Sequence, residues 1–280
     1  MRDVFLVHSR IPYAGDDALT GRYLVPRFGA RAVQDLERSA PAETSRLPYE
    51  ARARAMRSYA ASGPVPFGYF DAIYPNAVYL SALADPVERW LNFAGRVARD
   101  RRHWFHAHLA QIGIDPGCGG PDRMALLILA DKRSRQVLCN SVCRLASGLA
   151  LENRQVLTED HAATALRNLL SPRYLVGQAN EPAELIARLS ARFGPARDKT
   201  TERHADDWPV CSRKDLRPDV IDRIRAANQQ DCRLFEALEE KSAAFRNRSD
   251  LRLVASPSRI RAASPTSTAR PASEPLTVAG

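Results

Sequence analysis

The stretch Val78-Tyr79-Leu80-Ser81-Ala82-Leu83-Ala84-Asp85-Pro86-Val87-Glu88-Arg89-Trp90 decides the fold, because a buried strand there leads directly into a capped helix. The apolar run 78–83 contains Val, Tyr and Leu, which are typical of a buried strand. Asp85 can cap the helix that follows, and Pro86 suits the first helical position, where a missing N–H costs nothing. A strand that feeds a helix N-terminus is where α/β proteins hold phosphate groups.

Further strands and helices alternate along the chain. Short apolar runs at 4–8 and 174–177 predict two more buried strands. Asn180 is expected to cap a helix that stops at Gly194, and one long amphipathic helix is expected after Pro218. Strands separated by helices imply a parallel sheet covered on both faces, so we predict a three-layer α/β domain.

The domain organisation follows from length and composition. A chain of 280 residues, 45% of them hydrophobic, is long enough for one domain at 1–248. The segment 249–280 is rich in Ser, Pro, Ala and Arg and is predicted to be a disordered tail. No apolar run approaches the roughly 20 residues of a membrane span, and the five cysteines contain no Cys-x-x-Cys pair. We therefore expect a cytoplasmic protein with reduced thiols and no signal peptide.

The charge of the chain comes from arginine. The formal net charge is +9, and 37 of the 41 basic residues are arginines, which together with abundant alanine is typical of a GC-rich bacterial genome. Guanidinium groups bind phosphate and sulfate bidentately. The composition favours an anionic partner and does not specify a nucleic acid.

Several segments resemble the carbohydrate sulfotransferases, the family of heparan sulfate and related bacterial sulfotransferases. The turn at 84–89 resembles their Arg-Asp-Pro-x-x-Arg element, 11–19 their Ile-Pro-Lys-Thr-Gly-Gly-Thr-Ser-Leu loop, and 63–70 their Gly-His-Phe-Pro-Tyr-Gly-Leu-His loop. Further similarity covers 140–148, 158–177 and 228–234. The resemblance implies a P-loop-NTPase-like sulfotransferase fold and sulfuryl transfer from 3′-phosphoadenosine 5′-phosphosulfate to a carbohydrate hydroxyl.

The sequence departs from this family where the family keeps its charged groups. The slot of the loop lysine holds Tyr13, that of the leading arginine holds Ala84, and that of the loop histidine holds Pro64. Asp16 and Asp17 add negative charge to the loop that would cradle a phosphate. A positioned cationic donor is worth about 3–4 kcal/mol of transition-state stabilisation. Weak or absent activity, as in a pseudoenzyme, is therefore expected.

The resemblance and the residue types nominate five residues for donor binding. Arg10 could replace the missing lysine, although a solvated surface arginine is the simpler interpretation. Asn92 fills a serine slot and can still donate a hydrogen bond, while Arg89 either contacts the ligand or forms an ion pair. The predicted donor-binding residues are Arg10, Tyr13, Gly15, Arg89 and Asn92.

Histidines give weaker signals. His8, at the end of the first strand, is a candidate general base or a hydrogen-bonded structural residue. His103, His106 and His108 lack a carboxylate that would complete a ligand set, so no metal is expected. The basic and aromatic run 96–106 either binds a polyanion or forms a solvated face. The alternative to a sulfotransferase is a non-catalytic protein that binds an anionic glycan, lipid or nucleic acid through its arginines.

Overall fold

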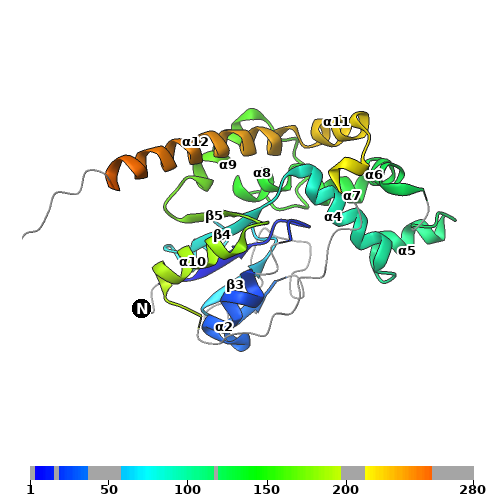
Figure 1. Cartoon of the computed structure of the whole chain (residues 1–280). Coiled ribbons are helices and arrows are strands. Elements are labelled where there is room, and N and C mark those ends of the chain that lie inside the picture. Colours follow the sequence, from blue (N-terminus) through cyan, green and yellow to red (C-terminus); the bar gives the residue numbers. More distant parts are fainter. Residues whose placement is uncertain (1–3, 16–18, 37–57, 117–118, 197–211, 254–280) are drawn as a thin grey trace, which may run out of the picture. The chain divides into compact units, whose positions relative to one another are not determined.

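The computed structural model describes residues 4–15, 19–36, 58–116, 119–196 and 212–253, with side chains described up to residue 241 (Figure 1). The chain divides into two units, residues 1–240 and residues 241–280. No helix among the described residues is both long enough and apolar enough to cross a membrane.

A parallel sheet forms the centre of the first unit. Among the described residues it has five strands in the order β2-β3-β1-β4-β5, so the predicted parallel α/β architecture is confirmed (Figure 1). Leu6 is in register with Ala60 on one side and with Val78 on the other. The strands are β1 Leu6–Ser9, β2 Val33–Asp35, β3 Ala60–Gly63, β4 Val78–Leu83 and β5 Tyr174–Gln178.

Side-chain alternation along the strands builds a core on each face of the sheet. In β4, Leu80 and Ala82 pack in one core and Tyr79 in the other. One face is covered by η1 Thr20–Leu24 and α10 Pro182–Phe193. The opposite face is covered by α8 Ser141–Ala146, α9 Glu159–Leu169 and the first turns of α12 Gln229–Leu253. The sheet is thus covered on both faces, as the sequence predicts.

A third core lies within a group of helices beside the sheet. Trp90 and Phe93, both almost inaccessible to solvent, anchor it from α4. Its helices are α4 Pro86–Arg99, α5 Trp104–Gln111, α6 Gly120–Ala130, α7 Lys132–Leu138 and α11 Pro218–Ala227. The remaining short elements are α2 Val25–Phe28, η2 Ala30–Ala32 and η3 Arg213–Asp215.

Two predictions about element boundaries are wrong. The helix α10 begins at Pro182 with Glu181 at the N-cap and no capping side chain, so Asn180 does not cap it. The long helix expected after Pro218 is divided at Asn228, whose amide oxygen accepts a hydrogen bond from the Asn140 peptide N–H at 3.0 Å. This long-range contact outweighs the continuous amphipathic pattern.

The predicted tail is only partly described. The helix α12 continues to Leu253, five residues into the segment 249–280. The rest of that segment lies outside the described residues.

Candidate functional site

The carboxyl ends of β1 and β4 lie at a switch point of the sheet. From β1 the chain goes to β2 on one side, whereas from β4 it goes to β5 on the other, and α/β proteins bind ligands in the crevice that such a reversal leaves. A cleft of about 1260 Å³ lies there. We call it the switch-point cleft; its walls include Gly15, Ala84, Asp85, Glu88, Asn92, Asn180, Arg225, Arg233, Glu236 and Glu239.

The turn from β4 into α4 forms one wall of this cleft. The Asp85 carboxylate accepts a hydrogen bond from the Val87 peptide N–H at 2.7 Å, which confirms the predicted cap. The cap therefore occupies the helix N-terminus that the sequence suggests for a phosphate. Ala84 lines the cleft with a methyl group and supplies no donor from its side chain.

The charge of the switch-point cleft is predominantly negative. Its lining includes two guanidinium groups and four carboxylates. Arg233 forms an exposed ion pair with Glu159 at 2.8 Å. Burial, followed by the nearby Asp85 carboxylate, raises the pKa of Glu88. The other lining charges are those of Arg225, Glu236 and Glu239.

The loop after β1 separates this cleft from a second cavity. Tyr13 and Gly15 have positive φ values of 61° and 82°, which turn the chain sharply. The Asn92 side-chain amide donates to the Tyr13 carbonyl at 3.0 Å, and both Gly15 and Asn92 line both cavities. The predicted acids Asp16 and Asp17 lie outside the described residues.

The second cavity has a volume of about 770 Å³ and collects arginines. We call it the arginine cavity; its walls include Arg10, Tyr13, Pro64, Asn92, Arg96, Asp100, Arg102, His103, Trp104 and Arg133. Arg10, predicted to serve the donor, lies here and pairs with Asp35 at 3.2 Å. Pro64, which fills the slot of the family's loop histidine, also lines this cavity.

Tyr13 connects the loop to the helices beside the sheet. Its ring packs edge-on against Phe93, with ring centres 4.7 Å apart, and its hydroxyl lies 2.9 Å from His103 Nε2. The Phe105 peptide N–H donates to His103 Nδ1 at 3.2 Å. A neutral ring then carries its proton on Nε2 and donates it to Tyr13. The lysine slot is thus occupied by an aromatic residue that faces away from the switch-point cleft.

His8 lies inside the protein, in β1. Its side chain is fully buried, and Nδ1 lies 2.9 Å from the Thr20 hydroxyl and 3.0 Å from the Ser62 hydroxyl. His8 lines neither cavity. This is the hydrogen-bonded structural placement, so the geometry does not support the predicted role as a general base.

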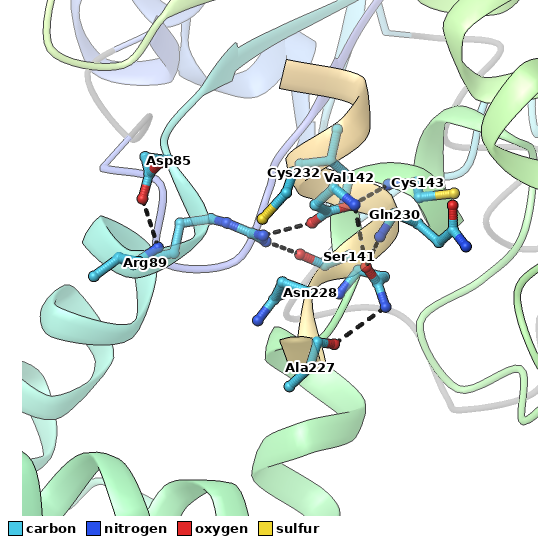
Figure 2. Close-up of polar contacts among 12 residues, drawn as sticks. Asp85, Arg89, Ser141, Val142, Cys143, Ala227, Asn228, Gln230 and Cys232 are labelled. Atoms are coloured by element: carbon cyan, nitrogen blue, oxygen red, sulfur yellow. Dashed lines mark hydrogen bonds and ion pairs between the residues drawn. The ribbon is translucent and has the colours of Figure 1, made fainter. Parts of the chain in front are cut away.

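Arg89 belongs to a buried polar network (Figure 2). The guanidinium group is fully buried, pairs with the Asp231 carboxylate at 2.5 Å and also donates to Ser141. Asp231 accepts two further bonds, from the peptide N–H groups of Val142 and Cys143. Burial raises the Asp231 pKa, and Arg89 and the two N–H groups counteract this rise. Arg89 lines neither cavity, so of its two predicted roles the structure places it in the ion pair.

The network joins three of the segments on which the predicted resemblance to sulfotransferases rests. Arg89 comes from 84–89, Asn140 and Ser141 from 140–148, and Asp231 from 228–234, and hydrogen bonds connect these segments. Figure 2 shows the Arg89 side chain directed towards Ser141. Asn140 contributes through its amide oxygen, which accepts from the Gln230 and Asp231 peptide N–H groups. These residues hold α4, α8 and α12 together behind the switch-point cleft.

Sequence reasoning missed the buried partners of Arg89 and the position of Arg133. The partners of Arg89 are 52 and 142 positions away along the chain, so no local pattern connects them. Arg96 belongs to the run 96–106, for which the sequence left open a polyanion-binding role or a solvated face, and it lines the second cavity. Arg133 had no comparable signal, because its place beside Trp104 depends on how α7 packs.

Among the described residues, no group of three or more His, Cys, Asp or Glu side chains is placed to hold a metal ion. Comparison with known proteins does not assign the chain to a family: no family model matches the sequence, and no curated protein matches it either.

Proposed function

We propose that this protein has a P-loop-NTPase-like sulfotransferase fold and binds an adenosine nucleotide bearing phosphate or sulfate, with weak or absent sulfuryl transfer. One observation carries the proposal. The loop after β1 and the turn after β4, the two segments that resemble the donor-binding motifs of sulfotransferases, line one cleft at the switch point. That is where the chemistry of a nucleotide donor would require them.

The same cleft explains why turnover should be slow. Sulfuryl transfer breaks the bond from sulfur to the 5′-phosphate oxygen, so negative charge grows on the departing phosphate. Ala84 and Tyr13, which faces the arginine cavity, contribute no cation, and no histidine among the described residues lines the cleft. The Asn92 amide and the loop backbone remain as donors. Loss of each positioned cationic donor costs about 3–4 kcal/mol, which is a rate factor of roughly 10² to 10³.

Calorimetry with adenosine 3′,5′-bisphosphate at low salt tests the nucleotide site. We expect a dissociation constant below millimolar, and a several-fold tighter one for Glu88→Gln, because a lining carboxylate is neutralised. Glu184→Gln is the matched control, since Glu184 is exposed on α10 and lines neither cavity. Absence of heat at millimolar nucleotide would remove the proposal.

A second candidate function is non-catalytic binding of an anionic partner. The arginine cavity favours it, because its lining includes four guanidinium groups. This function predicts retention on heparin resin that weakens steeply as salt is raised and that does not change when nucleotide is added. Retention that persists unchanged at high salt would exclude it.

A further inference from the structure

The N-terminus of α4 borders the switch-point cleft and offers a ligand few N–H groups. Pro86 has no N–H, and the Asp85 carboxylate accepts the Val87 N–H at 2.7 Å. The Arg89 N–H donates to the Asp85 carbonyl at 3.0 Å. Among the first four residues of this helix, all of them described, the Glu88 N–H alone remains, beside its own carboxylate. A helix N-terminus binds phosphate through several such groups, so this one is closed to a phosphate.

Two carboxylates stand at the same place in the cleft. We call Ala84, Asp85 and Glu88 the acidic corner of the switch-point cleft. Asp85 is half-buried and its orientation is fixed by the capping bond, but a carboxylate accepts about four hydrogen bonds, so it can still accept from a ligand. Burial, followed by the Asp85 carboxylate, raises the pKa of Glu88 against a smaller opposite effect of Arg213. The acidic corner therefore favours ligand hydroxyls over a further anion.

Hydrogen-bond donors of the cleft lie one helical turn from the acidic corner. Asn92 follows Glu88 by four residues on α4, and such positions share a helix face with Cβ atoms roughly 5–6 Å apart. The Asn92 amide has two N–H groups, of which one donates to the Tyr13 carbonyl at 3.0 Å. The other, with the loop at Gly15, can hold a phosphate in the cleft. One helical turn is about the span of a ribose, so the ribose hydroxyls of that ligand reach the acidic corner.

We propose that the switch-point cleft selects an adenosine 5′-phosphate whose ribose hydroxyls are free, with Asp85 and Glu88 as the specificity-determining residues. Free hydroxyls donate to the two carboxylates, whereas a phosphate on the 3′-oxygen places a second anion against them. Dinucleotide-binding proteins use the same chemistry, in which a carboxylate binds a free ribose hydroxyl and an arginine accommodates a phosphorylated one. This inference rests on the proposed function and narrows its ligand to nucleotides phosphorylated at the 5′ end alone.

Two isomeric nucleotides test the proposal. Adenosine 5′-diphosphate and adenosine 3′,5′-bisphosphate have the same composition and differ in the position of one phosphate. Calorimetry at low salt compares them on the full-length wild-type protein, on Glu88→Gln and on the matched control Glu184→Gln, whose residue is exposed on α10 and lines neither cavity. The dideoxy analogue 2′,3′-dideoxyadenosine 5′-diphosphate, which lacks both ribose hydroxyls, tests the hydroxyl contact itself.

The expected result is a preference that depends on the charge of Glu88. We expect the wild-type protein and Glu184→Gln to bind the 5′-diphosphate about tenfold or more tighter than the 3′,5′-bisphosphate. In Glu88→Gln this ratio should fall to about threefold or less, because one of the two carboxylates of the acidic corner loses its charge. The dideoxy analogue should bind the wild-type protein several-fold more weakly than the 5′-diphosphate, because the carboxylates lose their donors.

Equal or tighter binding of the 3′,5′-bisphosphate to the wild-type protein would overturn this inference and leave nucleotide binding in the cleft standing. An unchanged ratio in Glu88→Gln, or equal affinities for the 5′-diphosphate and its dideoxy analogue, would overturn it as well. Absence of heat with all three nucleotides at millimolar concentration would instead remove the proposed function, and this inference with it. Thermal melting checks that each variant is folded, and a ratio of two affinities measured on one variant does not depend on the folded fraction.

Discussion

The two cavities share a loop and a helix but differ in charge. Among the described residues, four carboxylates outnumber two arginines in the lining of the switch-point cleft, whereas four arginines and one acid, Asp100, line the arginine cavity. The parallel strands place the first cleft at the switch point of the sheet, and side chains from separate elements set the charge of each lining. The difference shows that the position of a cleft in a fold and its charge are set by separate parts of the sequence.

The largest expected effect is a loss of stability when the buried network of Arg89 is broken, because this network holds the helix α4 that borders both cavities. Arg89→Met leaves the Asp231 carboxylate buried without its counter-ion, so we expect the free energy of unfolding to fall by about 3–5 kcal/mol. Urea denaturation measures it. Arg233→Met, which removes an exposed pair with Glu159, is the control and should cost less than about 1 kcal/mol. A loss in Arg89→Met as small as in the control would show that the network does not hold α4.

Adding a cation to the switch-point cleft should reduce the difference in charge between the two cavities. Ala84→Arg is expected to increase the affinity for adenosine 3′,5′-bisphosphate by about tenfold or more, because a hydrogen bond to a charged group contributes roughly 1.5–3 kcal/mol. Calorimetry compares it with Ala84→Gln, which adds a polar side chain without charge. An equal gain in both variants would refute the electrostatic explanation.

The pH dependence of stability sharpens the comparison on the arginine side. The pKa of His103 is lowered to about 4 in the folded protein, so below about pH 6.5 the unfolded chain binds a proton that the folded chain excludes. The stabilisation of the folded state by neutral His103 is therefore complete above pH 6.5 and decreases as the pH falls towards 4.

We expect the protonation of His103 to lower the free energy of unfolding by roughly 1–2 kcal/mol between pH 7.5 and pH 5.0. His103→Asn, which keeps a capping side chain, should lose less over the same interval in urea denaturation. Parallel curves for the two proteins would contradict the prediction.

The smallest effect concerns the contact that holds the loop on the arginine side. Tyr13→Phe removes the hydroxyl that lies 2.9 Å from His103, and we expect a loss of about 1 kcal/mol in the free energy of unfolding. Tyr59→Phe is the control, because the Tyr59 side chain is 47% exposed. Equal melting temperatures for both variants would show that this hydrogen bond contributes nothing.

The sequence was informative where the signals are local. The strand β4, the Asp85 cap and the start of α4 at Pro86 follow from neighbouring residues, and the structure confirms all three. The strands β2 and β3 could not be predicted from local sequence. The strand β3 consists of Ala, Ser and Gly, and the three-residue strand β2 has a single β-branched residue, Val33, so both depend on partners elsewhere in the sheet. The division at Asn228 depends on a residue 88 positions away.

The candidate site shows the same limit. The parallel topology alone predicts that the β1 loop lies beside the β4 turn. The role of Arg89 could not be predicted, because it depends on the ion pair with the distant Asp231. An isolated guanidinium on a helix has the same sequence signature whether it is solvated, paired or bound to a ligand. The partners that distinguish these cases belong to other helices.

The hydrogen bond from Asn92 to the Tyr13 carbonyl has a consequence for communication between the two sides of the loop. The Asn92 side chain holds the loop through this bond and lines both the switch-point cleft and the arginine cavity. A ligand that displaced the Asn92 amide from one cavity would therefore change the space available in the other. Thermodynamic reciprocity then requires that any help or hindrance be mutual and equal in size. Asn92, with Gly15 beside it in both linings, is where such coupling would pass from one cavity to the other.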